Sequence, residues 1–149
     1  MEPKLIHVEQ KLLAGLEYFG PFKGEGWTEG NVIGKLWQRF GEVWQRHQSK
    51  LVPYVINPTI SYELAIWNEA EFEKTTNFCT FVGTEVSPEA IGNLPLELVI
   101  RATPSHTYAS FTVKGEAIRT WETDFYGGWM TENGDAIAEF SDYNLQIQA

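Results

Sequence analysis

The stretch that decides the fold reads NVIGKLWQRFGEVW and spans residues 31–44. Asn31 suits a helix N-cap. Apolar side chains then recur at helical spacing, at Ile33, Leu36, Trp37, Phe40, Val43 and Trp44. This spacing predicts a helix that begins after Asn31 and ends near residues 47–49. Its apolar stripe needs a covering surface, and the flanking segments can supply one.

Those flanking segments alternate in side-chain character, which is typical of strands. Residues 8–19 predict one strand, and residues 62–67 and 78–86 predict two more. The charged residues 68–76 are predicted to be a connection. We place Val82, Val86, Leu64 and Ile66 under the helix. The side chains that then point away from the helix are Glu63, Ala65, Trp67, Cys79, Phe81 and Glu85.

The second half of the chain repeats this order. Residues 108–114 predict a strand, and residues 116–130 a helix with Trp121, Phe125 and Trp129 on one stripe. Residues 136–147 are extended. We therefore predict an α+β fold of two pseudo-symmetric βαββ modules that form one antiparallel sheet. Two helices cover one face, and a ligand cleft lies between the halves.

The length of 149 residues fits one domain. We assign residues 1–149 to it, with halves of about 1–92 and 93–149. The net charge of −9 and the lack of a Lys/Arg cluster argue against direct binding of nucleic acid. An acidic protein attracts cations instead. The single cysteine, the lack of a signal-like segment and the lack of a membrane span favour a cytoplasmic protein.

Several segments resemble the GyrI-like, or AraC-type, effector-binding domain of bacterial transcription regulators. The similar stretches are IGKLWQRF at residues 33–40, FCTFVGTEV at 78–86 and TYASFTVKG at 107–115, together with Trp121 and Trp129. The resemblance implies two βαββ modules around a cleft. It also implies apolar, often cationic ligands and a buried carboxylate among aromatic rings. The family's acidic closing strand has no matching residues in 143–149, so we expect that strand to be missing or replaced.

Candidate ligand-binding residues follow from the predicted open face and from aromatic residues on loops. A carboxylate beside aromatic rings can attract a cation. The candidates are Glu85, Phe81, Trp67, Glu63, Tyr54, Tyr108 and Trp27. For each carboxylate the alternative is a solvent-exposed strand residue, or in the case of Glu85 an ion pair with Arg101. For the rings the alternative is a place in the core.

The sequence predicts no metal site and no cofactor, because the three histidines are scattered and no phosphate-binding loop occurs. We predict a stand-alone domain that binds a hydrophobic or cationic small molecule and acts as an effector sensor. No catalytic residue is predicted. The alternatives are a small hydrolase of strained rings that uses a pocket Glu, and a protein inhibitor of the gyrase-inhibitor type. A homodimer and a separate DNA-binding partner both remain open.

Overall fold

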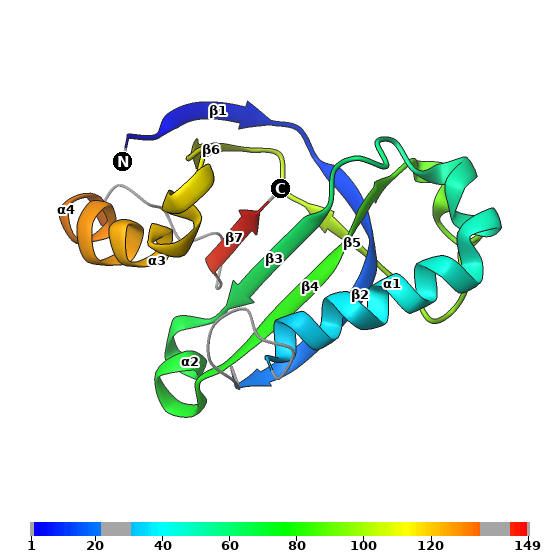
Figure 1. Cartoon of the computed structure of the whole chain (residues 1–149), viewed down its shortest axis with the longest axis horizontal. Helices are drawn as coiled ribbons and strands as arrows, with labels where there is room; N and C mark the ends of the chain where they lie inside the picture. The colour runs from blue at the N-terminus through cyan, green and yellow to red at the C-terminus, as the bar shows by residue number, and fades with distance from the viewer. Residues whose placement is uncertain (1, 22–30, 135–143, 149) are drawn as a thin grey trace. The chain divides into compact units, whose positions relative to one another are not determined.

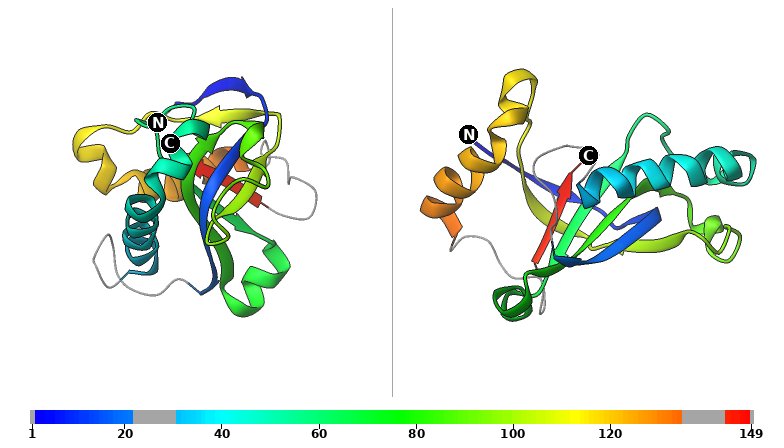
Figure 2. Two further views of the ribbon diagram at one scale, coloured as in Figure 1. Left: turned by 90° about the vertical axis from the view of Figure 1, so that its right-hand side faces the viewer. Right: turned by 60° about the horizontal axis from the view of Figure 1, so that its bottom comes forward.

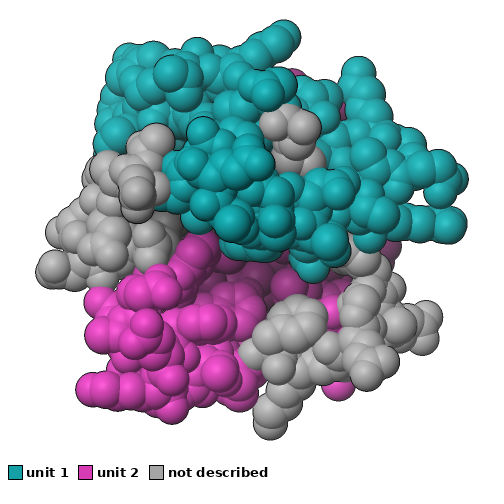
Figure 3. Space-filling view, turned by 90° about the vertical axis from the view of Figure 1, so that its left-hand side faces the viewer, with its two compact units in different colours: residues 1–10, 104–139 teal, residues 11–103, 140–149 magenta. Residues whose placement is uncertain are grey.

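A computed structural model of the chain describes residues 2–21, 31–134 and 144–148. The fold is α+β with antiparallel sheets. Two compact units are distinguished by colour in Figure 3: unit 1 comprises residues 1–10 and 104–139, and unit 2 comprises residues 11–103 and 140–149.

Unit 2 contains a five-stranded antiparallel sheet in the order β5-β2-β4-β3-β7 (Figure 1). Its strands are β2 (Lys11–Pro21), β3 (Tyr62–Trp67), β4 (Asn77–Val86), β5 (Val99–Thr103) and β7 (Asn144–Gln148). Its helices are α1 (Val32–Leu51) and α2 (Glu69–Thr75), with short 3-10 turns η1 (Val52–Tyr54) and η2 (Pro88–Ala90). The central strand β4 lies between β2 and β3, so both of its edges are paired.

Helix α1 begins where the sequence predicts. The side chain of Asn31 accepts a hydrogen bond from the backbone N–H of Ile33 at 2.8 Å, which satisfies one of the free donors of the first turn. Phe40 and Val43 are buried, as expected of the apolar stripe. Figure 2 shows α1 lying along one face of the five-stranded sheet.

Unit 1 contains a two-stranded antiparallel sheet of β1 (Lys4–Val8) and β6 (His106–Ser110). Helical turns follow: η3 (Gly115–Arg119), α3 (Trp121–Asp124), the π-helical η4 (Phe125–Trp129) and α4 (Met130–Asn133). Aromatic rings hold these turns together: Phe125 and Trp129 stack with centroids 5.9 Å apart, and Phe111 meets both rings edge-on.

Three predictions about the elements need correction. The described strands form two sheets rather than one, because β1 and β6 pair with each other. Residues 68–76 are not a plain connection: Asn68 caps α2 by accepting a hydrogen bond from the backbone N–H of Glu71. The predicted helix at 116–130 is broken into short turns, and the pair Gly127-Gly128 lies in the π-helical one, consistent with the low helix propensity of glycine.

The sequence left two alternatives for the end of the chain, a missing strand and a replaced one, and the described residues 144–148 form a strand without acidic residues, β7. Its backbone pairs antiparallel with β3, from Glu63 opposite Gln148 to Trp67 opposite Asn144. The C-terminal strand therefore forms the edge of the five-stranded sheet next to β3.

Candidate functional site

The register of the five-stranded sheet determines which side chains share a face, because directly opposed residues of antiparallel strands project to the same side. Glu63 opposes Val82, and Val82 opposes Leu16. Leu64 opposes Phe81. Helix α1 covers the Glu63 side, since the indole of Trp37 reaches Glu63. We call the Glu63 side the α1 face and the Phe81 side the opposite face.

This register corrects the predicted placement of Glu63 and Trp67. Both lie on the α1 face, whereas the sequence analysis placed them on the face away from the helix. Alternation sorts the residues of one strand into two sets, but it does not say which set meets the helix. Phe81 and Glu85 do lie on the opposite face, as predicted.

Glu63 is a buried carboxylate beside aromatic rings. The residue is only 9% exposed. The Nε1–H of Trp37 donates a hydrogen bond to Glu63 Oε2 at 2.8 Å. Trp37 meets Phe40 edge-on with ring centroids 6.1 Å apart, and Phe40 lies 6.2 Å from Trp44. The carboxylate therefore lies at one end of an aromatic row on α1.

Trp37 is the residue of this site that sequence reasoning missed, because its position on the apolar stripe of the predicted helix indicates packing in the core rather than ligand binding. One signal was available: a buried indole N–H needs an acceptor. The 26 residues between Trp37 and Glu63 leave no local pattern that would identify the acceptor. Only the packing of α1 on β3 brings the two together.

On the opposite face, the carboxylate of Glu85 forms an ion pair with a lysine side chain. Lys11 Nζ lies 3.3 Å from Glu85 Oε2, so the partner is Lys11 rather than Arg101. Burial raises the pKa of the neighbouring Tyr62 hydroxyl; the charge of Lys11 lowers it, and Glu85 raises it further. These three groups form a compact polar cluster above the buried apolar residues Leu13 and Phe81.

Arg101 pairs with Glu17 on the same face, and its Nη2 lies 3.5 Å from the Cys79 sulfur. Burial raises the pKa of the Cys79 thiol, and the opposing charge of Arg101 is the smaller effect. The protonated thiol is therefore favoured, which makes Cys79 a poor nucleophile.

Two further aromatic candidates have contacts of their own. Tyr54 packs with the apolar cluster of Ala14, Val86 and Ala90 in unit 2. Tyr108 belongs to unit 1, where its hydroxyl donates to the carbonyl of Pro104 at 2.8 Å. Trp27 lies outside the described residues.

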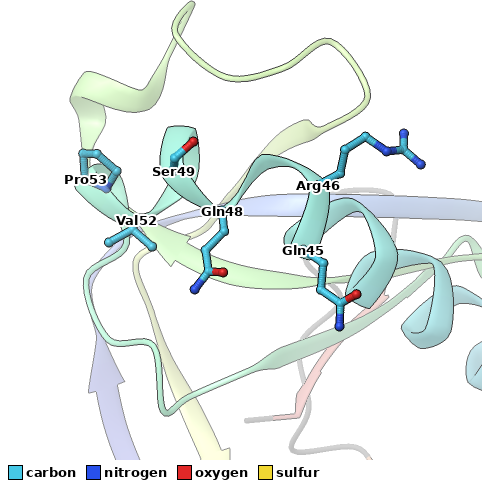
Figure 4. Close-up of a pocket in the computed structure, with 6 residues that line it drawn as sticks. All are labelled: Gln45, Arg46, Gln48, Ser49, Val52 and Pro53. Carbon is cyan, nitrogen blue, oxygen red and sulfur yellow. The ribbon is translucent and has the colours of Figure 1, made fainter.

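A surface hollow of about 510 Å³ lies at the C-terminal end of α1 (Figure 4). Its lining residues are Gln45, Arg46, Gln48, Ser49, Val52 and Pro53. Most of these side chains are polar and lie on the exposed surface of the helix. The hollow therefore suits water better than an apolar ligand. Unit 1 has a second hollow of about 700 Å³, lined by acidic side chains and by Trp129.

The described part of the chain has neither a cluster of metal-binding side chains nor a membrane-spanning helix. Residues 2–21, 31–134 and 144–148 contain no group of three His, Cys, Asp or Glu side chains placed to hold a metal ion. No helix within these ranges has the length and apolar character needed to cross a membrane.

Comparison with known proteins identifies a family for this chain. The model of a family described as Cass2, integron-associated effector binding protein, matches residues 4–145. No curated protein matches the chain.

Proposed function

The chain belongs to the Cass2 family of integron-associated effector binding proteins, and from this premise we propose that its effector is a hydrophobic cation. The family description supports small-molecule binding over nearly the whole chain. The cationic character is our proposal, and the observation that carries it is the buried carboxylate of Glu63 beside the ring of Trp37.

A carboxylate that is largely removed from water attracts a positive charge more strongly than an exposed one, because solvent screening is weaker. The faces of aromatic rings add to this attraction through their quadrupoles. On the α1 face the carboxylate of Glu63 and the rings of Trp37 and Phe40 supply both features. Partly exposed side chains, among them Trp37 and Ala65, adjoin this position.

Glu85 is the second candidate for the ligand carboxylate, and Glu63 ranks above it because Glu63 lies beside the aromatic rings of α1. The ammonium group of Lys11 would have to be displaced before a ligand cation could bind there. This cost would reduce the affinity of the opposite face for a cation.

The experiment uses tryptophan fluorescence to compare the binding of two matched probes. They are tetraphenylphosphonium, a hydrophobic cation, and triphenylphosphine oxide, a neutral analogue. We expect saturable quenching by the cation and much weaker binding of the oxide. Glu63→Gln keeps the hydrogen-bond acceptor for Trp37 and removes the charge. It should weaken binding of the cation about tenfold, from the loss of a partly desolvated charge interaction.

Glu85→Gln is the matched control, because it removes one carboxylate from the other face of the same sheet. It should leave the affinity nearly unchanged. Equal affinities of wild type and Glu63→Gln for the cation would contradict the role of Glu63. If neither probe binds to the wild type, the cation proposal fails as a whole.

We also propose that this domain is a sensor of the transcription-regulator type. Its net charge of −9 is unfavourable for contact with DNA, so such a role would require a separate DNA-binding partner. The pseudo-symmetry of the two halves remains a prediction. The first half contains one such module, in the order β2, α1, β3, β4 with α2 inserted.

A further inference from the structure

Two buried hydroxyl groups on the α1 face are not explained by the fold. Thr80 is 1% exposed and Thr84 is 5% exposed. Among the residues that the structure describes, neither Oγ1 atom has a hydrogen-bond partner. Buried polar groups in folded proteins are nearly always paired, so two such groups on one strand need a reason.

The two threonines flank the position of Glu63. Thr80 and Thr84 lie on either side of Val82 along β4, and Val82 is the cross-strand neighbour of Glu63. Four residues of strand separate the two Cα atoms by about 13 Å. The carboxylate thus lies between the two hydroxyls along the direction of the strand, on the same face of the sheet.

Each threonine has a small cross-strand neighbour on one side. Thr80 opposes Ala65 on β3 and Tyr18 on β2, and Thr84 opposes Ala14 on β2. A valine has the shape of a threonine and would fill either position without burying a polar atom. An unpaired buried hydroxyl costs stability, whereas its replacement by an apolar group of the same shape is neutral or stabilising. The two hydroxyls therefore cost the unliganded protein stability.

We propose that Thr80 and Thr84 bind hydrogen-bonding groups of the effector, so that the effector is a cation that also carries an oxygen or nitrogen able to form hydrogen bonds. This inference rests on the proposed cation site at Glu63. It adds a ligand preference to that site. The site binds a cation with such a group in reach of either hydroxyl more tightly than a cation of the same charge that has only hydrocarbon substituents. Thr80 and Thr84 determine that preference, and Glu63 supplies the charge recognition.

The test uses three probes of equal charge: tetraphenylphosphonium and its 3-hydroxyphenyl and 4-hydroxyphenyl derivatives. Each is titrated into wild type, Thr80→Val, Thr84→Val and the double variant. We expect the wild type to bind at least one hydroxylated probe about fivefold more tightly than the parent, as one net hydrogen bond would give. At least one of the single variants, and the double variant, should lose this preference and keep the affinity for tetraphenylphosphonium.

Thermal unfolding without ligand gives an independent readout. Both valine variants should unfold at the same temperature as the wild type or higher, because each removes an unpaired buried hydroxyl. A lower unfolding temperature in both would show that the hydroxyls support the fold, and it would overturn the inference. So would equal wild-type affinities for all three probes, or a preference that survives in the double variant.

The outcomes separate this inference from the proposed function. If tetraphenylphosphonium binds and Glu63→Gln weakens it while the threonine variants change nothing, the cation site stands and the hydroxyl inference fails. If no phosphonium probe binds to the wild type, both fail together.

Discussion

At the scale of single residues, a pair of glycines leaves no room for side chains between the two strands β2 and β4 of unit 2. Gly15 on β2 lies directly opposite Gly83 on β4. A Cβ atom added to Gly83 would overlap the backbone carbonyl of Ala14, and one added to Gly15 would overlap that of Val82. Both obstacles are backbone atoms, which cannot rotate away. The two central strands therefore depend on the absence of side chains at this position.

Gly83→Ala should destabilise the protein by about 3 kcal/mol, because the strands must separate to admit the methyl group. Urea unfolding at pH 7 measures the change in the free energy of unfolding. Gly41→Ala is the control: Gly41 is an exposed helical position where nothing lies within 4 Å of the added Cβ. It should stabilise the protein by about 0.5–1 kcal/mol. A Gly83→Ala variant as stable as the wild type would show that the strands can adjust.

At the scale of elements, the C-terminal half of α1 is tied to the segment before β5 by one carboxylate. Glu97 accepts hydrogen bonds from Arg46 at 2.7 Å and contacts the His47 ring at 2.6 Å. The backbone of His47 leaves the helical region, with φ −116° and ψ 15°. The hydrogen bond of His47, aided by the charges of Arg46 and Arg39, lowers the pKa of Glu97 below its ordinary value.

A lowered carboxyl pKa in the folded protein gives stability that is present above the ordinary pKa and lost as pH falls through the lowered one. Glu97→Gln should therefore be less stable than the wild type at pH 7. The difference should shrink as the pH falls below about 5. Urea unfolding from pH 3 to pH 7 would follow it. The control is Glu42→Gln, which removes an exposed pair with Arg39 within α1. A difference between wild type and Glu97→Gln that stays constant over this range would contradict the prediction.

Some of the helices and strands could be predicted from the sequence, and others could not. Helix α1 and strand β3 were predictable, because Asn31 marks the start of the helix and alternation defines residues 62–67. The helix runs to Leu51, beyond the predicted end at 47–49, since the irregular backbone at His47 does not terminate it. The extended character of residues 136–147 was predicted, but the pairing of β7 with β3 was not predictable, because it links residues about 80 positions apart.

The residues of the candidate site could be predicted in part, but their placement relative to α1 could not, because it depends on contacts between distant residues. The sequence identified Glu63 and Glu85 as carboxylates among aromatic residues, and it grouped each correctly with its strand neighbours. It could not determine which face of the sheet α1 covers. That choice depends on tertiary packing, through the contact of Trp37 with Glu63. The presence of Lys11 beside Glu85 is likewise a long-range contact without a local signal.

At the scale of the whole molecule, unit 2 is built from two distant parts of the chain. Residues 11–103 supply four strands, and β7 adds the fifth at the edge of β3. Without β7, the backbone N–H and C=O groups along that edge of β3 would be exposed. An exposed strand edge is a template for pairing with another chain.

A chain that ends at residue 143 should therefore be less stable and should self-associate. Size-exclusion chromatography with light scattering would detect the larger species. A synthetic peptide of residues 144–149, added in excess, should restore the original size by pairing with β3 as an added strand. A shortened chain that stays at its original size and stability would show that β7 is dispensable.

The pairing of β7 with β3 also has a consequence for synthesis on the ribosome. Translation proceeds at about 5–20 residues per second, so about 4–16 s separate the completion of β3 from that of β7. During this interval the nascent chain can form β2, α1, β3 and β4, but the β3 edge still awaits its last strand. Neighbouring nascent chains on one messenger RNA present the same open edge at the same time. Slow translation of residues 68–148 should therefore increase aggregation during expression.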